Sequence, residues 1–420
     1  QEEYFSTVKK DSLRVFTSDG VEASVVIEGS ALSYLTSNNH FDYRTLSIQD
    51  KTFILNRTVE VEEQPVPAFT ENLAGTVIVN SVQYSADYSV TLAGSKVTYK
   101  TFAADSDENE KVNVTEILTQ LKTKLDALNK PVTITVLDIS MEIASTNGAG
   151  FTLDVVGGRN NLALESFQDN VRDASEIPNR SVEGRLVRVD NSTSDEDDYY
   201  LKYSTAIKAW EESRAPDVSP GLVNSTMPHE LISTAANEFT FKEVEWNDRL
   251  VGDIITSPSP SFVGLTINNL FFTDNRLGFL SGPNVVMSRA SAYENFFVKS
   301  ALTQIDSDPI DLNTNSTIPS NLVHSLPVPQ GVILFSNRQQ FLMSANDSIY
   351  TPTDTYIRQI SNYEVDEDIS PVDLGTYQIF IQKTLGYCKV MVMQIPDINQ
   401  PPSVIDISKV VAEWIPPNID

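Results

Sequence analysis

The feature that most constrains the fold is a dense succession of short strand-like runs, separated by turn residues, along almost the whole chain. Alternating or β-branched residues over five or six positions are typical of β-strands. The clearest runs are residues 13–17, 52–56, 76–80, 132–137, 332–336 and 377–381. Ser18-Asp19-Gly20 after the first run is a tight-turn signal. Many short strands favour a propeller, sandwich or barrel, and without an exact internal repeat the three alternatives stay open.

One segment alone has a convincing helical period. One face of it is apolar, with Ile117, Leu118, Leu121, Leu125 and Leu128. Asn113 and Glu116 resemble a capping pair before it, and Pro131 follows its end. Strand-like runs on both sides predict a small α+β unit over residues 70–160. A second, weaker helical stretch is expected at Leu162–Arg172.

Turn and loop residues divide the remaining chain, which we expect to be all-β. Three proline-containing stretches, residues 215–221, 257–261 and 326–331, predict rigid surface connectors. Residues 190–198, between strand-like runs, predict an acidic hairpin loop that is solvated, including Asp195-Glu196-Asp197-Asp198.

The balance of acidic and basic residues limits the functions that are expected of the chain. With 57 acidic and 30 basic residues the formal net charge is −27, the reverse of a chain that neutralises phosphates. Such acidity disfavours tight, non-specific DNA binding, yet suits a channel that DNA slides through without adhering. Cys388 is the one cysteine, which excludes an intrachain disulfide and a cysteine-rich metal site. No apolar run approaches the roughly 18 residues that cross a bilayer.

Catalytic motifs are missing from the sequence. Gly148-Ala149-Gly150 lacks the third glycine of a dinucleotide loop, and residues 278–282 lack the spacing of a nucleophile elbow. The three histidines, His40, His229 and His324, lie far apart in the sequence, and each is interpreted as a surface or core histidine. We therefore predict no catalytic and no cofactor-binding residues.

A calcium loop is the one metal site worth weighing. The ligand positions 1, 3, 5 and 12 of the template are Asp105, Asp107, Asn109 and Glu116. Glu110 occupies the position that requires glycine, so a solvated loop is the preferred interpretation and no metal site is predicted.

Two other function classes remain as alternatives. A β-rich chain with many acids and 15 tyrosines could bind or cleave host surface glycans, although no carboxylate pair stands out. A secreted glycoprotein is supported only by seven N-x-S/T triplets, at Asn56, Asn113, Asn179, Asn191, Asn224, Asn315 and Asn346.

A distinctive linear order of motifs runs from about residue 200 to residue 345. Its parts are Thr226-Met227-Pro228-His229-Glu230-Leu231, Phe239-Thr240-Phe241, Trp246, Pro260-Ser261-Phe262-Val263-Gly264, residues 275–282, Ser288-Arg289, Tyr293, Asn295-Phe296 and residues 308–311. This order closely resembles the tail tubular protein B, or nozzle, family of short-tailed bacteriophages. Weaker resemblance extends to residues 14–16 and 52–57, to Phe335-Ser336 and Gln340-Phe341, and to Trp414-Ile415-Pro416.

The resemblance implies a mainly β fold, with a β-propeller-like body and a small α+β insertion. The expected domains are residues 1–68, the first strands of the body; 69–183, the inserted α+β domain; and 184–420, the rest of the body. Six copies would form a ring that extends the tail tube below the adaptor ring of tail tubular protein A. Viral DNA would pass through this ring, and tail fibres would contact it. Family members are longer at both ends, so we expect this chain to be a fragment.

Within these motifs, the residues have scaffold roles. Residues 276–281 and 285–288 predict two strands joined by Gly282-Pro283-Asn284. Arg276 and Arg289 are expected to form charge-assisted bonds with neighbouring loops, for example to Asp274 or Glu294. The expected core residues are Phe272, Leu277, Phe279 and Phe297.

Overall fold

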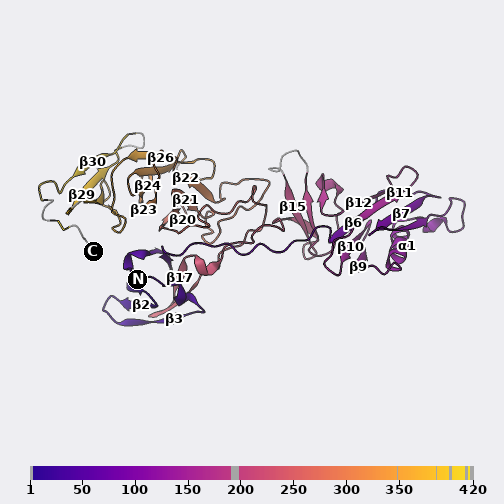
Figure 1. The fold of residues 1–420 in the computed structure, drawn as a ribbon, viewed down its shortest axis with the longest axis horizontal. Helices are drawn as coiled ribbons and strands as arrows, with labels where there is room; N and C mark the ends of the chain where they lie inside the picture. Colours follow the sequence, from indigo (N-terminus) through magenta and orange to yellow (C-terminus); the bar gives the residue numbers. More distant parts are fainter. Residues whose placement is uncertain are drawn as a thin grey trace.

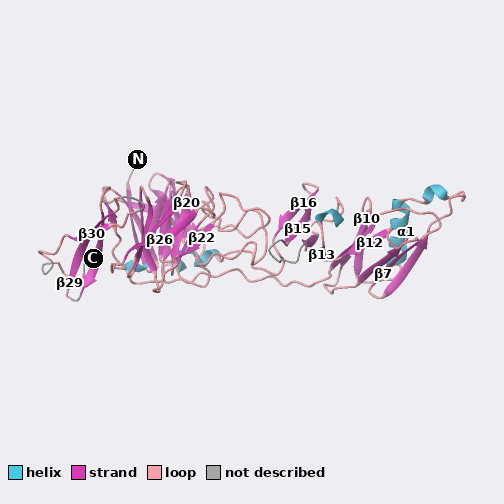
Figure 2. Cartoon of the chain, turned by 90° about the horizontal axis from the view of Figure 1, so that it is seen from above, coloured by secondary structure: helices cyan, strands magenta, loops and turns pink. Residues whose placement is uncertain are grey.

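The computed structural model describes residues 3–190, 198–347, 349–384, 386–396, 400–411 and 415–416. These residues are mainly β-strand and form an elongated molecule (Figures 1 and 2). A body of four sheets occupies one end, an α+β arm occupies the other, and one sheet lies between them. The predicted fold class, mainly β with a small α+β insertion, is confirmed, and the sheets of the body are compatible with the predicted propeller-like arrangement.

The first sheet of the body joins both sides of the insertion. Its order is β1 (Tyr4–Lys9), β2 (Ser12–Thr17), β3 (Glu22–Ile27), β18 (Glu238–Glu243), β17 (His229–Ala235), β5 (Lys51–Asn56) and β4 (Tyr43–Ile48). Neighbours are antiparallel except β3 and β18, which are parallel. Because β3 precedes the arm in the chain and β18 follows it, their pairing closes the body across the insertion.

Three further sheets of the body each consist of four consecutive antiparallel strands, the arrangement of propeller blades. The first contains β19 (Asn269–Thr273), β20 (Arg276–Ser281), β21 (Asn284–Met287) and β22 (Ile310–Asn313). The second contains β23 (Leu322–Val328), β24 (Gly331–Ser336), β25 (Gln340–Ala345) and β26 (Thr355–Ser361). The third contains β27 (Val372–Asp373), β28 (Gln378–Thr384), β29 (Tyr387–Gln394) and β30 (Ser403–Asp406).

Apolar side chains fill the space between successive sheets. Phe53 of β5 and Phe279 of β20 share one core, and side chains of β20–β22 and β24–β25 form the next. Phe335 and Phe380 join the last two sheets with ring centroids 5.7 Å apart. Burial of one such side chain contributes about 1.5–3 kcal/mol, so these cores hold the sheets together.

The arm has its own core beneath the helix α1 (Val114–Asp126). One sheet is β12 (Leu164–Phe167), β6 (Ala74–Val79), β10 (Ser140–Ser145) and β9 (Val132–Val136). The other is β11 (Leu153–Gly157), β7 (Asp87–Leu92) and β8 (Ser95–Lys100). The Asn113 side chain accepts a hydrogen bond from the Glu116 N–H at 2.9 Å, which confirms the predicted cap. Within the described residues, no helix combines the length and the apolar character that crossing a membrane requires.

The arm is connected to the body by the middle sheet and by two segments, residues 57–73 and 214–228, here together called the strap. The sheet is β13 (Asn170–Val171), β14 (Leu186–Val189), β15 (Tyr199–Ser204) and β16 (Ala209–Ser213). In the strap, the Val61 N–H donates to the Leu265 carbonyl at 2.9 Å, and the Gln64 N–H donates to the Gly221 carbonyl at 2.9 Å. Short 3₁₀ helices are η1 (Ala31–Tyr34), η2 (His40–Asp42), η3 (Asn109–Lys111), η4 (Ala174–Glu176) and η6 (Asn224–Thr226).

Two predictions about local structure are wrong. The helical stretch expected at Leu162–Arg172 contains β12 and β13, because pairing of β12 with β6 satisfies its backbone better than a short isolated helix would. The stretch at 215–221 is only partly on the surface: Asp217 is exposed, but Ala215 and Val218 are buried in the strap. Ser257 in the second stretch is buried too. In the third stretch, Pro327 lies within the edge strand β23, where a missing N–H costs no ladder bond.

Candidate functional site

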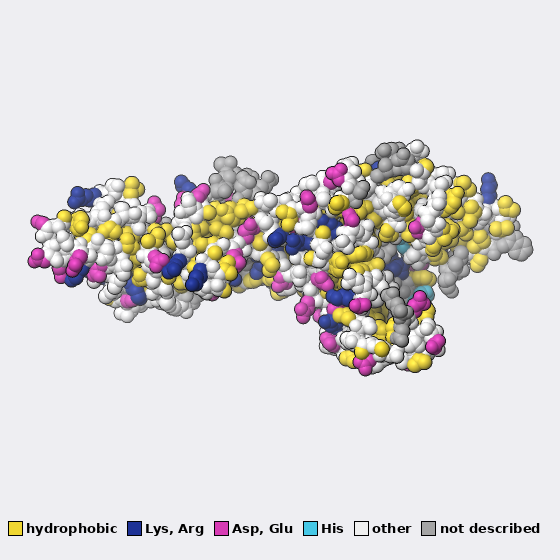
Figure 3. Space-filling model, turned by 180° about the vertical axis from the view of Figure 1, so that it is seen from behind, with side chains coloured by type: hydrophobic (Ala, Val, Ile, Leu, Met, Phe, Trp, Pro, Cys, Tyr) yellow, Lys and Arg dark blue, Asp and Glu magenta, His cyan; other side chains and the backbone are white. Residues whose placement is uncertain are grey.

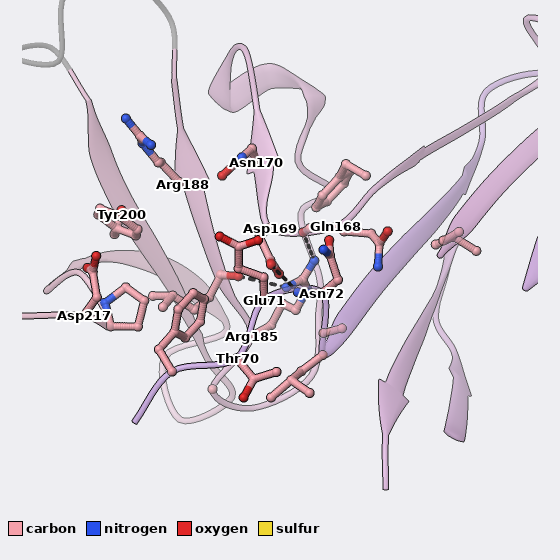
Figure 4. A pocket seen from close by; sticks show the side chains of 18 of the residues that line it. Thr70, Glu71, Asn72, Gln168, Asp169, Asn170, Arg185, Arg188, Tyr200 and Asp217 are labelled. Carbon is pink, nitrogen blue, oxygen red and sulfur yellow. Dashed lines mark hydrogen bonds between the residues drawn. The ribbon is translucent and has the colours of Figure 1, made fainter. Parts of the chain in front are cut away.

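One concave site in the described chain is a cleft of about 750 Å³ between the strap, the arm and the middle sheet, here called the waist cleft. Its walls come from residues 69–74, 153, 166–170, 184–186, 188, 200 and 216–217. In Figure 4, Asn72, Asp169 and Arg185 lie close together, whereas Tyr200 and Asp217 lie on the other side of the cleft. The cleft therefore gathers segments that are distant in the sequence.

A buried ion pair lies at the inner end of the waist cleft. Arg185 Nε is 3.5 Å from Glu142 Oε2, and both side chains are almost fully buried. Thr76 and Ser181 each donate a hydroxyl hydrogen bond to the Glu142 carboxylate, at 2.9 and 2.8 Å. Burial outweighs these contacts, so it raises the pKa of Glu142 and lowers the pKa of Arg185. The pair joins β10 of the arm to the start of the middle sheet.

Two polar side chains of the cleft, those of Arg185 and Asp169, also bond to the backbone. Arg185 donates to the Leu186 carbonyl at 2.8 Å and to the Gln168 carbonyl, and its guanidinium lies 5.7 Å from the Phe167 ring centre. The Asp169 carboxylate accepts a hydrogen bond from the Asn72 N–H. These bonds fix the backbone where the strap enters the arm.

On the outer side of the cleft, Arg188 forms an ion pair with Asp198, which is buried. Asp198 is thus not part of a solvated acidic run; Asp195, Glu196 and Asp197 lie outside the described residues. Burial raises the pKa of Tyr200. The described lining contains no histidine or cysteine, and its carboxylates do not form a pair with a nucleophile. The arrangement suits a mechanical joint.

The structure holds the three histidines in separate surroundings. His40 is exposed in η2, whereas His229 in β17 stacks on Tyr34 with ring centroids 4.2 Å apart. His324 in β23 is fully buried, and its Nε2 lies 2.9 Å from the Asp366 carbonyl. Burial lowers the pKa of His229, and it lowers the pKa of His324 to about 4. Both are neutral core histidines near neutral pH.

The residues of the calcium template do not converge on a common point. The Asn109 amide donates to the Ala104 carbonyl at 3.1 Å, and the Glu116 carboxylate accepts from Gln120 at 2.9 Å inside α1. Across the described ranges, no group of three or more His, Cys, Asp or Glu side chains is placed to hold a metal ion.

The arginines of the motif region have other partners than expected. Arg276 is buried and donates to the backbone carbonyls of Ser288, Asp308 and Asp306, at 2.8, 2.7 and 2.6 Å. Arg289 lies 3.8 Å from the Asp308 carboxylate. The expected bonds to Asp274 and Glu294 were wrong because the loop that precedes β22 folds back over β20 and presents its carbonyls first. Among the expected core residues, Leu277, Phe279 and Phe297 are buried, and Phe272 packs against the same core.

Sequence reasoning missed the Glu142–Arg185 pair. One signal was present, since Glu142 is a charged residue inside the strand-like run of β10. Nothing in the sequence connected it with Arg185, which comes from another sheet.

Comparison with known proteins places the whole chain in one group. A family model described as "Bacteriophage nozzle protein" matches residues 1–420. The curated protein "Tail tubular protein gp12" of Escherichia phage T7 is 27% identical over 430 aligned residues, which cover 99% of this chain and 53% of that protein. The chain therefore spans about half the length of this relative. The resemblance seen in the linear motifs is confirmed.

Proposed function

This chain belongs to the bacteriophage nozzle protein family, and on that basis we propose that it is a structural component of the short virion tail. Its role is to extend the tail tube as a nozzle and to conduct DNA during ejection into the host. The observation that carries this proposal is the family match over the full chain. The relative from phage T7, a tail tubular protein, supports the same role.

A conduit makes two physical demands that this chain can meet. Its wall must be rigid, and the body supplies packed sheets whose interfaces are filled with aromatic side chains. Its lumen must not retain DNA, and a net charge of −27 repels phosphate instead of binding it. We propose that DNA passes without specific contacts.

The assembly follows as part of the proposal. Six copies form a closed ring that contacts the adaptor ring of tail tubular protein A above and the tail fibres at its side. Within each copy the domains are residues 1–68, 69–183 and 184–420, with the arm of the second domain joined to the body through the strap. An elongated subunit with a narrow joint suits a ring whose contacts lie at two levels.

We further propose that the protein is not an enzyme and uses no cofactor or metal. The family is one of structural tail proteins, and the polar groups of the waist cleft stabilise the joint between arm and body. Burial raises the pKa of Glu142, but Thr76, Ser181 and Arg185 occupy its oxygens, so the carboxyl is not free to act on a substrate.

Cryo-electron microscopy of assembled tails tests the role. We expect a ring of six copies below the adaptor, with the body and the arm both visible in each copy. A chain that stays monomeric with the purified adaptor, and that is missing from tails, would contradict the proposal. Steady release of reducing ends from host capsule or lipopolysaccharide by the full chain would contradict the non-enzymatic assignment.

A further inference from the structure

Two arginines lie side by side at the edge of the first sheet of the body. Arg44 is in β4, and Arg57 follows the end of β5. The register pairs Arg44 with Leu55, so residue 57, two positions further, is on the same face as Arg44. Both guanidinium groups donate to one carbonyl oxygen, that of Phe41, at 2.8 Å from Arg44 and 3.3 Å from Arg57. Two like charges are therefore held next to each other.

Within the described part of the chain the arginine pair has no carboxylate partner, although the chain has nearly twice as many acidic as basic residues. Neither side chain has a carboxylate within 4 Å among the described residues, whereas six other arginines form such ion pairs. The paired arginines are Arg14, Arg180, Arg185, Arg188, Arg249 and Arg289. Arg44 instead also donates to the carbonyls of Glu367 and Asp368, at 3.3 and 3.4 Å.

Several polar atoms around the arginine pair are buried without a partner. Nε of Arg44 and Nε of Arg57 have no acceptor. Nδ1 of the buried His324 has no hydrogen-bond partner either. A buried donor without an acceptor costs about 1–3 kcal/mol, more when it is charged. Burial and the neighbouring Arg57 lower the pKa of Arg44 to about 10, so its surroundings disfavour its charge.

The acidic groups around the pair have other partners. Asp366 Oδ2 lies 2.8 Å from Lys383 Nζ, and Asp368 Oδ2 lies 3.6 Å from the same ammonium group. The Asp42 carboxylate accepts hydrogen bonds from Ser37 and Asn39. None of these carboxylates forms an ion pair with Arg44 or Arg57.

A hollow between the two halves of the body is visible in Figure 3. Figure 3 shows Lys or Arg and His side chains together on the wall of that hollow. The Arg44 and Arg57 side chains are both partly exposed, although their two Nε atoms are buried. The arginine pair lies between the first sheet and the loop before β27, since Arg44 donates to the carbonyls of Glu367 and Asp368. This position inside one chain disfavours a duplex as occupant.

We propose that Arg44 and Arg57 form a binding site for a small tetrahedral oxyanion of the phosphate type. The oxyanion would accept hydrogen bonds from both guanidinium groups and cancel their repulsion, as bidentate arginine–phosphate contacts do. It would also bridge the first sheet of the body to the loop at residues 366–368, which Arg44 already contacts. The site is independent of the proposed conduit role.

Calorimetric titration of the full chain with inorganic phosphate tests the proposal, in chloride buffer of constant ionic strength. We expect saturable binding of one phosphate per chain. Arg57→Met should weaken it about tenfold, corresponding to about 1.4 kcal/mol, and Arg57→Lys should have a smaller effect because charge remains. Arg172→Met, which removes an exposed arginine of the middle sheet, is the matched control and should bind as the wild type does.

A second readout does not depend on the stability of the arginine variants. The chain has three histidines, so histidine-selective ¹³C labelling gives three signals. Phosphate should shift the one signal that disappears in His324→Gln. No saturable phosphate binding, or equal affinity in Arg57→Met, would overturn the proposal. Arg57-dependent binding of a short single-stranded DNA in place of phosphate would also overturn the proposal, since the arginine pair would then be a nucleic-acid contact.

Discussion

The body and the base of the arm each contain an arginine that is almost fully buried, and the two differ in their partners. Arg276 in the body donates to three backbone carbonyls and has no carboxylate within 4 Å among the described residues. Arg185 at the base of the arm faces a buried carboxylate, that of Glu142, at 3.5 Å, in addition to two carbonyls. Both sets of partners bind a buried guanidinium, but they respond differently to a change of pH.

This difference indicates which part of the molecule does not respond to pH and which part does. Backbone carbonyls do not titrate, so the bonds of Arg276 hold the loop around residues 306–308 at any physiological pH. A buried carboxylate does titrate, and its charged form is disfavoured by burial. The body is thus expected to be the invariant scaffold, and the joint of the arm the part that pH can adjust.

The largest expected effect comes from Arg276→Met. Methionine keeps much of the apolar stem but removes the donor of three carbonyls, two of them on the buried residues Ser288 and Asp308, which should destabilise the body by about 3–5 kcal/mol. Hydrogen exchange measured by mass spectrometry should show lost protection in peptides of β20–β22 and unchanged protection in α1 and β7.

The control for this change is Arg180→Met, which removes an exposed arginine near the base of the arm. It should leave exchange in both regions close to the wild type. Equal loss of protection in body and arm after Arg276→Met would contradict the expected difference between them, because the two regions would then unfold together.

A smaller effect in the body is expected from Gly278→Ala. A Cβ at this position would lie 2.2 Å from the Phe271 ring, which is itself buried between sheets. Overpacking of this kind costs about 1–3 kcal/mol. The unfolding free energy of Gly278→Ala in urea should fall by that amount, and adding Phe271→Leu should recover part of it. Additive losses in the double variant would show that the ring is not the cause.

What the sequence could and could not predict follows the same division between local and distant contacts. The helix with its Asn113 cap and the hairpin of β20 and β21 were predictable, because neighbours in the sequence decide them. The parallel pairing of β3 with β18 was not, since the whole arm separates the two strands. Nor were the partners of Arg276, which lie in an irregular loop without a pattern.

Asn113→Ala tests the arm alone, with a still smaller effect. The Asn113 side chain accepts the Glu116 N–H, and loss of an N-cap costs about 1 kcal/mol. Exchange should accelerate in α1 and in the strands beneath it, and the body should not respond. Asn113→Asp, which keeps the cap, is the matched control and should behave as the wild type does.

An effect that depends on pH is expected from Glu142→Gln. Burial raises the pKa of Glu142 in the folded chain above its unfolded value, in spite of Arg185. Between these two pKa values the folded chain binds more protons than the unfolded chain, so its stability falls as pH rises through that window.

Glutamine does not titrate, so the unfolding free energy of the wild type relative to Glu142→Gln should decrease as the pH rises from about pH 4, near the unfolded pKa of glutamate, through the raised pKa of Glu142 in the folded chain. Urea unfolding of both proteins across this range measures the difference. The slope should vanish when Arg276→Met is compared with the wild type, since carbonyl partners do not titrate. A relative stability of the wild type that rises with pH would mean that attraction to Arg185 outweighs burial, and the joint would then be most stable where Glu142 is charged.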